Sequence, residues 1–387
     1  MRTRPGIVPN CRIPRRNPKS RVASVSAWFQ TAIITSGRRS RIPGVTRQRE
    51  IGRVSAMKVL LLGGTGNISA ECAALLHARG YEVIVVTRGQ RPVPQHYRSL
   101  VVSDCHDRAA MSVALHGIAP DVVVNFLGYE LAHVQTDAEL FRGRIRQYIF
   151  VSSATVYAKP HRQLPLTENA PVGNAFSAYA QKKLACEEWL RNRSELPVTI
   201  VRPSHTYSCR WFPNCVNSAG WTFAARLLGR RPVFVPDDGE NPWTLTAAAD
   251  FAVGLAGLVG LDRAVGEAFH ITSDEALTWN QIYAETAAAL GVENPVVEKI
   301  PTEWLCQRFP QLTAGLKGDK SNPGIFDNSK IKQFVPDFVC RIPFAKGIRA
   351  SIAWYRDHPE EQITSEPTDA LFDEVALAWR EVPNRSL

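Results

Sequence analysis

Short apolar runs alternate with helical periodicities through much of the chain after residue 56. Lys58–Leu62 is a continuous apolar run that ends in glycines, which is typical of a parallel strand buried on both faces. Behind it, Ile68, Cys72 and Leu75 recur at helical spacing, and Gly80 ends that helix. Further strands are predicted at residues 82–86, 100–102, 121–126, 147–152 and 198–201, with another helix at 177–193.

This alternation predicts the fold class. Strands separated by helices form βαβ units, so we expect an α/β protein with a Rossmann-type doubly wound parallel sheet. The second half is less regular, with helices expected near residues 247–259, Trp279–Leu290 and 344–356. Because 331 residues exceed what one core usually holds, we expect a Rossmann domain over 57–203. Residues 204–387 should form mainly a smaller mixed C-terminal lobe that binds substrate at the carboxyl edge of the sheet.

The positive charge of the chain is concentrated in its first 56 residues. They hold thirteen Lys or Arg and one Glu, a net +12, so with +10 for the whole chain the other 331 residues carry −2. Nucleic-acid binding by the body of the protein is therefore disfavoured. Pro5, Pro9 and Pro14 interrupt any targeting helix. A disordered leader, or a true start at Met57, is favoured over a transit peptide.

Other classes of protein fit the composition poorly. No stretch approaches the ~20 apolar residues of a membrane span, so we expect no membrane association. The eight cysteines are scattered without a metal-ligand spacing, so no metal site is expected. Reduced thiols favour a cytoplasmic location.

A glycine-rich loop joins the first predicted strand to the first helix. Gly63 permits the tight turn, and Gly66 leaves room for a pyrophosphate to approach backbone N–H groups at the helix start. This context favours a dinucleotide site over a plain strand–helix turn. The expected cofactor contacts are Gly63, Thr65, Gly66, Asn67 and Ile68 in the loop, Arg88 after the second strand, Asp104 and Cys105 after the third, and Leu127 and Gly128 after the fourth.

The residue after the second strand bears on the choice of cofactor. NAD-binding proteins usually place an acid there, whereas this chain has Arg88. Because arginine can pair with a 2′-phosphate, the sequence predicts an NAD(P) site with a slight preference for NADP. The alternative is a solvent-exposed arginine at a strand end.

Three residues form a candidate catalytic set. Ser153 follows the fifth predicted strand, and Tyr179 and Lys183 lie four residues apart on one face of the next helix. We expect the Lys183 charge to favour the Tyr179 phenolate, so that Tyr179 can act as the acid–base group. Ser153 would hydrogen-bond the reacting hydroxyl or carbonyl. The alternatives are a surface tyrosine and a strand-end cap.

In combination, the glycine loop at 63–66, the stretch Ser-Ser-Ala-Thr-Val-Tyr at 152–157 and the Tyr179–Lys183 pair resemble the extended short-chain dehydrogenase/reductases. Specifically, residues 57–356 resemble the NAD-dependent epimerase/dehydratase family. The resemblance implies a nicotinamide cofactor and catalysis by Ser153, Tyr179 and Lys183, with Lys183 and Pro203 also contacting the cofactor. The sequences at 63–66 and 87–89 look closest to the branch that includes chloroplast stem-loop-binding proteins.

The chain departs from the family pattern in three places. Ser69 replaces the third loop glycine, which predicts looser packing of the first helix on the sheet. The segment 128–146 is shorter than in sugar epimerases, so a homodimer is possible but its usual helical interface is in doubt. Ala154-Thr155 replace the acidic pair of sugar dehydratases, so elimination of water is not expected.

We therefore expect an NAD(P)-dependent oxidoreductase or epimerase that acts on a secondary alcohol of a small-molecule substrate, a sugar nucleotide. The alternative is a non-catalytic or RNA-binding protein that retains the Rossmann domain. His205 either contacts substrate or is structural. Asp319-Lys320 are predicted to lie in a solvated turn.

Overall fold

The computed structural model describes residues 56–216 and 220–383. The predicted leader lies outside these residues, apart from Ala56.

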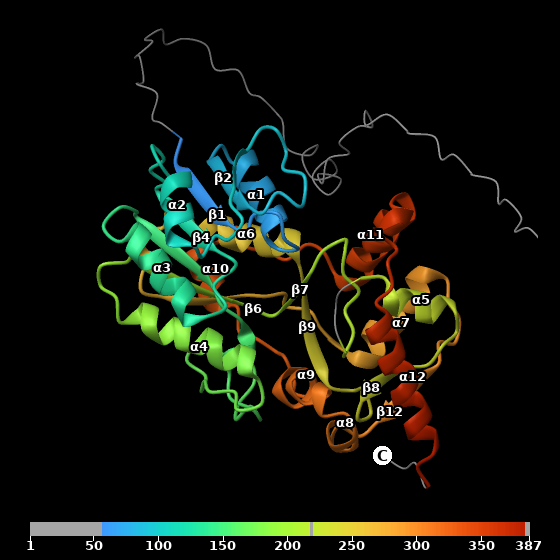
Figure 1. Cartoon of the computed structure of the whole chain (residues 1–387). Helices are drawn as coiled ribbons and strands as arrows, with labels where there is room; N and C mark the ends of the chain where they lie inside the picture. The colour runs from blue at the N-terminus through green and yellow to red at the C-terminus, as the bar shows by residue number, and fades with distance from the viewer. Residues whose placement is uncertain (1–55, 217–219, 384–387) are drawn as a thin grey trace, which may run out of the picture. The chain divides into compact units, whose positions relative to one another are not determined.

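A parallel sheet of seven strands organises the first part of the described chain (Figure 1). Its strands are β1 Lys58–Leu62, β2 Glu82–Thr87, β3 Arg98–Val101, β4 Val122–Asn125, β5 Gln147–Val151, β6 Val198–Pro203 and β10 Ala268–Ile271. Their order is β10-β6-β5-β4-β1-β2-β3, and every adjacent pair is parallel. Successive strands are added on one side of β1 up to β3 and then on its other side from β4 onwards. This change of strand order confirms the predicted doubly wound α/β fold.

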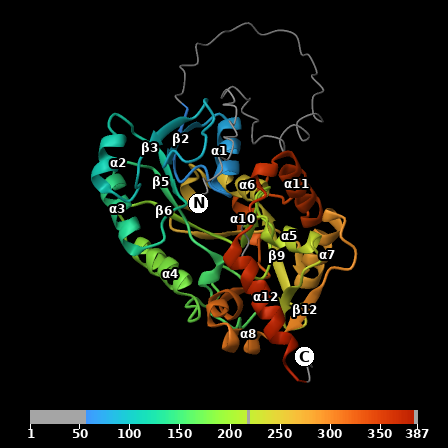
Figure 2. The same cartoon turned by 45° about the vertical axis from the view of Figure 1, so that its right-hand side comes forward.

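Helices cover both faces of this sheet, which is why its central strands are apolar throughout. On one face, α2, α3 and α4 pack in sequence, and α1, α6 and α10 cover the other (Figures 1 and 2). The central residues Val122, Val123 and Val124 of β4 are fully buried. These helices are α1 Ser69–Ala78, α2 Arg108–Ala114, α3 Leu131–Phe141, α4 Ala178–Arg191, α6 Ala248–Leu258 and α10 Ser329–Phe334.

A smaller mixed lobe follows in the sequence, as predicted. It has a three-stranded sheet in the order β11-β9-β7 and a two-stranded sheet of β12 and β8. These strands are β7 His205–Tyr207, β8 Val233–Pro236, β9 Pro242–Ala247, β11 Ala276–Thr278 and β12 Val297–Ile300. The lobe's helices are α5 Thr222–Leu228, α7 Trp279–Leu290, α8 Thr302–Arg308, α9 Thr313–Gly315, α11 Phe344–Asp357 and α12 Glu366–Arg380.

The two parts of the fold interleave in sequence. β10 and α6 lie beyond residue 203, yet β10 pairs with β6 at the edge of the seven-stranded sheet. The C-terminal lobe has its own core, in which residues of α5, α7, α11 and α12 surround β8. Figure 2 shows these helices grouped on one side, apart from α2, α3 and α4. Among the described residues, no helix is long and apolar enough to cross a membrane.

Local patterns predicted the long elements better than the short ones. α7 has the expected bounds, and α4 begins after Ser177, whose hydroxyl accepts the N–H of Ala180. The third strand runs over Arg98–Val101 rather than 100–102. The short helix α2, which buries only Met111, carries too weak a periodicity to be recognised.

Candidate active site

The predicted site residues converge on one edge of the seven-stranded sheet. Gly63, Leu127, Ser153 and His205 lie just beyond the carboxyl ends of β1, β4, β5 and β6. β1 and β4 are neighbouring parallel strands, and the strands that follow them in the chain lie on opposite sides of this pair. The carboxyl ends of β1 and β4 therefore leave a crevice suited to a ligand.

The glycine loop is shaped for close approach of a ligand. Gly63 has φ +89°, and a Cβ added there would lie 2.6 Å from Cγ of Leu127. A Cβ at Gly66 would meet only Ser69 Oγ at 3.1 Å and the Gly63 carbonyl at 3.8 Å. Among the described residues, the backbone N–H groups of Asn67 and Ile68 have no acceptor. Open space and free N–H groups at the start of α1 fit a cofactor pyrophosphate.

Ser69, in place of the third loop glycine, forms hydrogen bonds within the loop. Its side chain is buried, and its hydroxyl accepts the N–H of Gly66 at 2.8 Å and donates to the carbonyl of Gly63. The serine therefore ties the two ends of the loop together, where glycine could only permit a close approach. The chain replaces a packing contact by hydrogen bonds.

Asn67 connects the glycine loop to the C-terminal lobe. Its Nδ2 donates to the carbonyl of Thr206 in β7 at 3.0 Å, and its Oδ1 accepts from the Ser208 hydroxyl. The two bonds join residues 139 and 141 positions apart in the chain. The loop and the start of the substrate lobe thus have a fixed relation.

Arg88 is exposed beyond the end of β2, where either of its predicted roles remains open. A second arginine lies close by: Arg91 Nη1 donates to the carbonyl of Thr65 at 2.9 Å. Arg91 could not be singled out from the sequence, because it lies in an irregular segment without a motif. The structure therefore supplies two cations at this end of the site.

Asp104 and Cys105 lie with His106 at the start of the turn after β3. Their potential ligand atoms lie within 4.8 Å of one another, which is a metal-ligand arrangement in outline. Burial raises the pKa of the Cys105 thiol to about 11, helped by the nearby carboxylates of Asp137 and Asp104. The Cys105 thiol is therefore protonated at neutral pH in the metal-free protein.

A buried polar cluster fixes the loop after β4. Asn125 Oδ1 accepts the N–H of Leu127 at 2.6 Å, and its Nδ2 donates to Asp137 and to the Tyr148 hydroxyl. At the next position, a Cβ on Gly128 would lie 2.7 Å from the Phe150 ring. Gly128 therefore allows the loop to lie directly on β5, and Asn125 holds it there.

Ser153 and Tyr179 are brought together at the end of β5. Ser153 Oγ lies 2.8 Å from Thr155 Oγ1, and Tyr179 is 44% exposed in the first turn of α4. Burial raises the pKa of Tyr179 to about 12, although a hydrogen bond from Ser153 to the phenolate lowers it.

Lys183 is buried beneath the two catalytic candidates. Its Nζ donates to the carbonyl of Val151 at 2.8 Å and lies 4.7 and 4.9 Å from the ring centres of Tyr129 and Phe150. The Tyr179 ring centre is 6.0 Å away. Burial lowers the pKa of Lys183 to about 8. The ammonium is thus held by a carbonyl and aromatic faces rather than by a carboxylate.

Pro203 is the last residue of β6, and the residue before it forms a buried ion pair with α4. The Arg202 guanidinium makes two bonds to Glu187 of α4, with Nε to Oε1 at 3.0 Å and Nη2 to Oε2 at 2.5 Å. Its Nη1 donates to the Tyr157 hydroxyl at 2.9 Å, which in turn contacts His270. All four side chains are buried. The bidentate pair fixes α4, and with it Tyr179, relative to β6.

The C-terminal lobe adds two buried polar atoms to this end of the site. His205 Nε2 and Trp243 Nε1 are buried without a hydrogen-bond partner among the described residues. His205 pairs with Leu245 of β9, so its side chain is on the same face as that of Trp243 two residues earlier. Burial, together with the charge of Lys320, lowers the pKa of His205 to about 3, so the imidazole is neutral.

The sequence predicted that Asp319 and Lys320 lie in a solvated turn, but the structure does not place them in one. They belong to a π-helical turn, Leu316–Lys320, and their side chains are only 22% and 13% exposed. The prediction was wrong because the covering residues come from distant parts of the chain. The Lys320 carbonyl, for example, accepts from Trp279 Nε1 at 2.9 Å.

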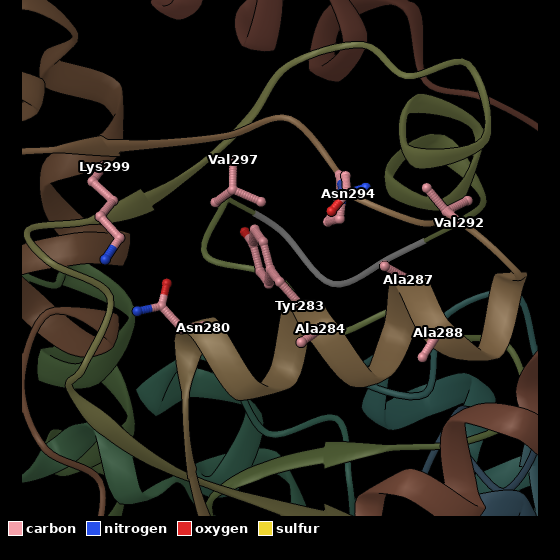
Figure 3. Close-up of a pocket in the computed structure, with 10 residues that line it drawn as sticks. Asn280, Tyr283, Ala284, Ala287, Ala288, Val292, Asn294, Val297 and Lys299 are labelled. Atoms are coloured by element: carbon pink, nitrogen blue, oxygen red, sulfur yellow. The ribbon is translucent and has the colours of Figure 1, made fainter.

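A separate cavity of about 300 Å³ lies against α7 and β12 (Figure 3). Ala284, Ala287 and Ala288 of α7 line one side, and Val297 and Lys299 of β12 lie across from them. None of its lining residues belongs to the predicted site.

The geometry of the sheet edge agrees with comparison to known proteins. The model of the NAD dependent epimerase/dehydratase family matches residues 59–142 and 138–271, which together are more than half of the chain. The chain therefore belongs to this family. It is an NAD(P)-dependent epimerase/dehydrogenase of the extended short-chain type, as its sequence predicted.

Individual relatives differ in what they are named for. The chain is 29% identical to 2′-dehydrokanamycin reductase from Streptomyces kanamyceticus over 262 residues, 65% of this chain and 72% of the relative. It is 27% identical to the chloroplast stem-loop binding protein of 41 kDa b from Arabidopsis thaliana over 265 residues, 65% of this chain and 68% of the relative. The solved UDP-glucose 4-epimerase of Bifidobacterium longum, in complex with NAD⁺ and UDP, superposes with a TM-score of 0.64 at 18% identity, over 79% of this chain and 100% of that one.

Proposed function

We propose that this enzyme transfers a hydride at a secondary alcohol, or at the corresponding ketone, of a sugar nucleotide, with Ser153, Tyr179 and Lys183 as its catalytic residues. The observation that carries the proposal is the meeting of Ser153 and Tyr179 above the buried Lys183 ammonium, at the sheet edge that also bears the glycine loop. A bound nicotinamide cofactor supplies the hydride donor or acceptor.

Tyr179 moves the proton in this proposal. In oxidation, its phenolate takes the proton of the substrate hydroxyl, and in reduction its hydroxyl gives a proton to the carbonyl oxygen. Ser153 donates a hydrogen bond to the same substrate oxygen and holds it in line for hydride transfer. The pKa of Tyr179, raised to about 12 by burial, indicates that the phenol is the resting form. A cofactor cation bound nearby would lower that pKa.

The cofactor would lie along residues that the sequence predicted. Gly63, Thr65 and Gly66, with the free N–H groups of Asn67 and Ile68, would receive its pyrophosphate. The other predicted contacts are Asp104, Cys105, Leu127, Gly128, Lys183 and Pro203. We infer a preference for NADP, because Arg88 and Arg91 together offer a 2′-phosphate two cations.

The substrate class is supported by the C-terminal lobe. His205 Nε2 and Trp243 Nε1 follow β6 in the chain and have no hydrogen-bond partner within residues 56–216 and 220–383. Oxygen atoms of a sugar or of its phosphates would satisfy them. A relative named as a reductase of a ketosugar derivative and a fold neighbour with bound UDP are consistent with this class.

The same proposal includes location and assembly. Seven described cysteines are free thiols, which supports a cytoplasmic enzyme. A homodimer is the assembly to test, although the short segment 128–146 speaks against a helical interface. Sedimentation velocity of the full-length protein would show a single 43 kDa species if no dimer forms.

One screen tests the proposed function. Purified full-length protein is incubated with NAD or NADP and a panel of sugar nucleotides, and the absorbance of reduced cofactor is followed. A substrate that reduces either cofactor, or whose 4-epimer appears with catalytic cofactor, supports the proposal. Reaction with free ketosugars but with no sugar nucleotide would contradict the proposed substrate class, while the proposed hydride transfer would still hold.

RNA binding is a second candidate, favoured by one observation. The chain resembles, at 27% identity, a protein named for binding stem-loops. Against it, residues 57–387 carry a net charge of −2. Retention of low-salt RNA affinity by a fragment without the basic leader would favour this candidate.

A further inference from the structure

The C-terminal lobe sends one turn to the catalytic tyrosine. The π-helical turn Leu316–Lys320 packs on the residues that lead into α4. A Cβ added at Gly318 would lie 3.3 Å from Cβ of Phe176 and 3.4 Å from Cβ of Ser177. Tyr179 follows Ser177 by two residues, in the first turn of α4. The turn therefore meets the polypeptide directly beside Tyr179, and π-helical turns of this kind often occur at functional sites.

Asn174 fastens this turn to the loop of the catalytic serine. Its Nδ2 donates to the carbonyl of Gly318 at 2.6 Å and to the carbonyl of Thr155 at 2.8 Å. Thr155 in turn shares a hydrogen bond of 2.8 Å with Ser153. One buried amide thus joins the C-terminal lobe to the end of β5.

The other side of the turn is held equally firmly. The carbonyl of Lys320 accepts hydrogen bonds from Trp279 Nε1 at 2.9 Å and from Asn241 Nδ2 at 3.1 Å. Asn322 Nδ2 donates to the carbonyl of Lys317 at 2.8 Å. Because these bonds use backbone carbonyls, the side chain of Asp319 is not required to hold the turn.

The Asp319 side chain faces inward, and its charge reaches the catalytic residues. It is 22% exposed, and its Oδ2 lies 3.5 Å from Nζ of Lys320. Its negative charge raises the pKa of Tyr179 and opposes the lowering of the Lys159 pKa by burial. The carboxylate is therefore placed between two lysines on one side and the phenol on the other.

The groups around Tyr179 divide into those that favour the phenolate and those that oppose it. A hydrogen bond from Ser153 favours it, whereas burial, Tyr129 and Asp319 oppose it. Lys183, on the same helix, directs its ammonium to the carbonyl of Val151. Asp319 is the one carboxylate among these neighbours, in the part of the chain that the structure describes.

We propose that Asp319 is a positioning residue that keeps the Tyr179 hydroxyl protonated and thereby favours reduction of a substrate carbonyl over oxidation of an alcohol. This inference rests on the proposed function, in which Tyr179 moves the proton. In the reduction, a hydride from the reduced nicotinamide adds to the carbonyl carbon while the O–H bond of Tyr179 breaks and its proton passes to the carbonyl oxygen. The phenolate then regains a proton from water.

A titration of Tyr179 in the cofactor-free protein tests the inference without any substrate. Full-length protein is labelled with 3-fluorotyrosine, and the Tyr179→Phe variant identifies the ¹⁹F resonance of Tyr179. We expect the midpoint of this resonance to fall by about half a pH unit or more in Asp319→Asn, because removal of a nearby negative charge favours the phenolate. Asp319→Glu should restore the wild-type midpoint.

Glu303→Gln is the matched control. Glu303 carries the same charge and pairs with Lys317 of the same turn, but on its outer, solvent-exposed side. Its removal should leave the midpoint unchanged. An equal or higher midpoint in Asp319→Asn, or an equal fall in Glu303→Gln, would overturn the inference.

Kinetics give a second readout, because a lower midpoint makes more phenolate available at a given pH. At pH 8, Asp319→Asn should oxidise the alcohol about threefold faster than wild type for a half-unit shift, with KM unchanged. A raised KM with unchanged kcat would mean that Asp319 only binds substrate. If Tyr179→Phe retained activity, the proposed function itself would fail, so the two failures are distinguishable.

Discussion

The burial of Lys183 makes a quantitative prediction about stability. The Lys183 side chain is 1% exposed, and its ammonium bonds to one backbone carbonyl. It has no carboxylate partner among the residues that the structure describes, since the neighbouring Glu187 pairs with Arg202. Burial lowers the pKa of Lys183 from 10.5 in the unfolded chain to about 8 in the fold. Between these pH values the unfolded chain binds a proton that the folded protein has released. The free energy of unfolding must therefore rise with pH in this window.

The size of the effect follows from the two pKa values. Each pH unit within the window adds about 1.4 kcal/mol, so from pH 7 to pH 9.5 Lys183 contributes an increase of about 2 kcal/mol. Lys183→Met removes the titrating group while keeping an apolar chain of similar length. The difference in unfolding free energy between wild type and Lys183→Met should therefore shift by about 2 kcal/mol in favour of wild type over this range.

Urea unfolding at pH 7, 8, 9 and 9.5 measures this difference. Lys182→Met is the matched control, because Lys182 is exposed and pairs with Glu130 at the surface. Its difference from wild type should not vary by more than about 0.5 kcal/mol across the same range. A Lys183→Met difference that is independent of pH would refute the reasoning, and would show that the ammonium stays charged in the fold.

Three further predictions concern the cofactor, the glycine loop and RNA. Calorimetry should show NADP binding tighter than NAD by about tenfold, or 1.4 kcal/mol, and Arg88→Ala should remove that preference; equal affinities in wild type would mean that Arg88 only faces solvent. Ser69→Ala should lower the unfolding free energy by about 0.5–1.5 kcal/mol, since it removes the hydrogen bond from the half-buried N–H of Gly66, and an unchanged urea midpoint would contradict this. RNA affinity of the full-length protein should fall steeply with salt in filter binding and be mostly absent from residues 57–387. Comparable low-salt affinity in that fragment would contradict the electrostatic assignment to the leader.

The Rossmann part of the fold was predictable because its signals are local. A parallel strand buried on both faces needs a continuous apolar run, and Lys58–Leu62 and the valines of β4 supply it. A glycine loop between strand and helix, and two residues four apart on a helix, also lie within short windows. The family of the chain could be named from these windows alone.

The remainder of the candidate site depends on contacts between distant residues. The sequence around Asp319 and Lys320 predicts a polar turn, because nothing within the segment indicates that Trp279 and Asn174 contact it. From the sequence, Ser69 was interpreted only as a replacement for the third loop glycine, because its two hydrogen bonds form only in the folded loop. Helical spacing predicts that Tyr179 and Lys183 lie on one face of α4, but not that the Val151 carbonyl binds the Lys183 ammonium.

The central claim is that Tyr179 carries the proton, and Tyr179→Phe tests it most directly. The account predicts that kcat falls by 100-fold or more, because general acid–base catalysis contributes about 10²–10⁴-fold. Cofactor affinity, measured by calorimetry on the same preparation, should change by no more than about twofold, since the ring is retained and the glycine loop is untouched. A variant that keeps more than about a tenth of the wild-type kcat with intact cofactor binding would contradict the assignment of Tyr179 as the acid–base residue.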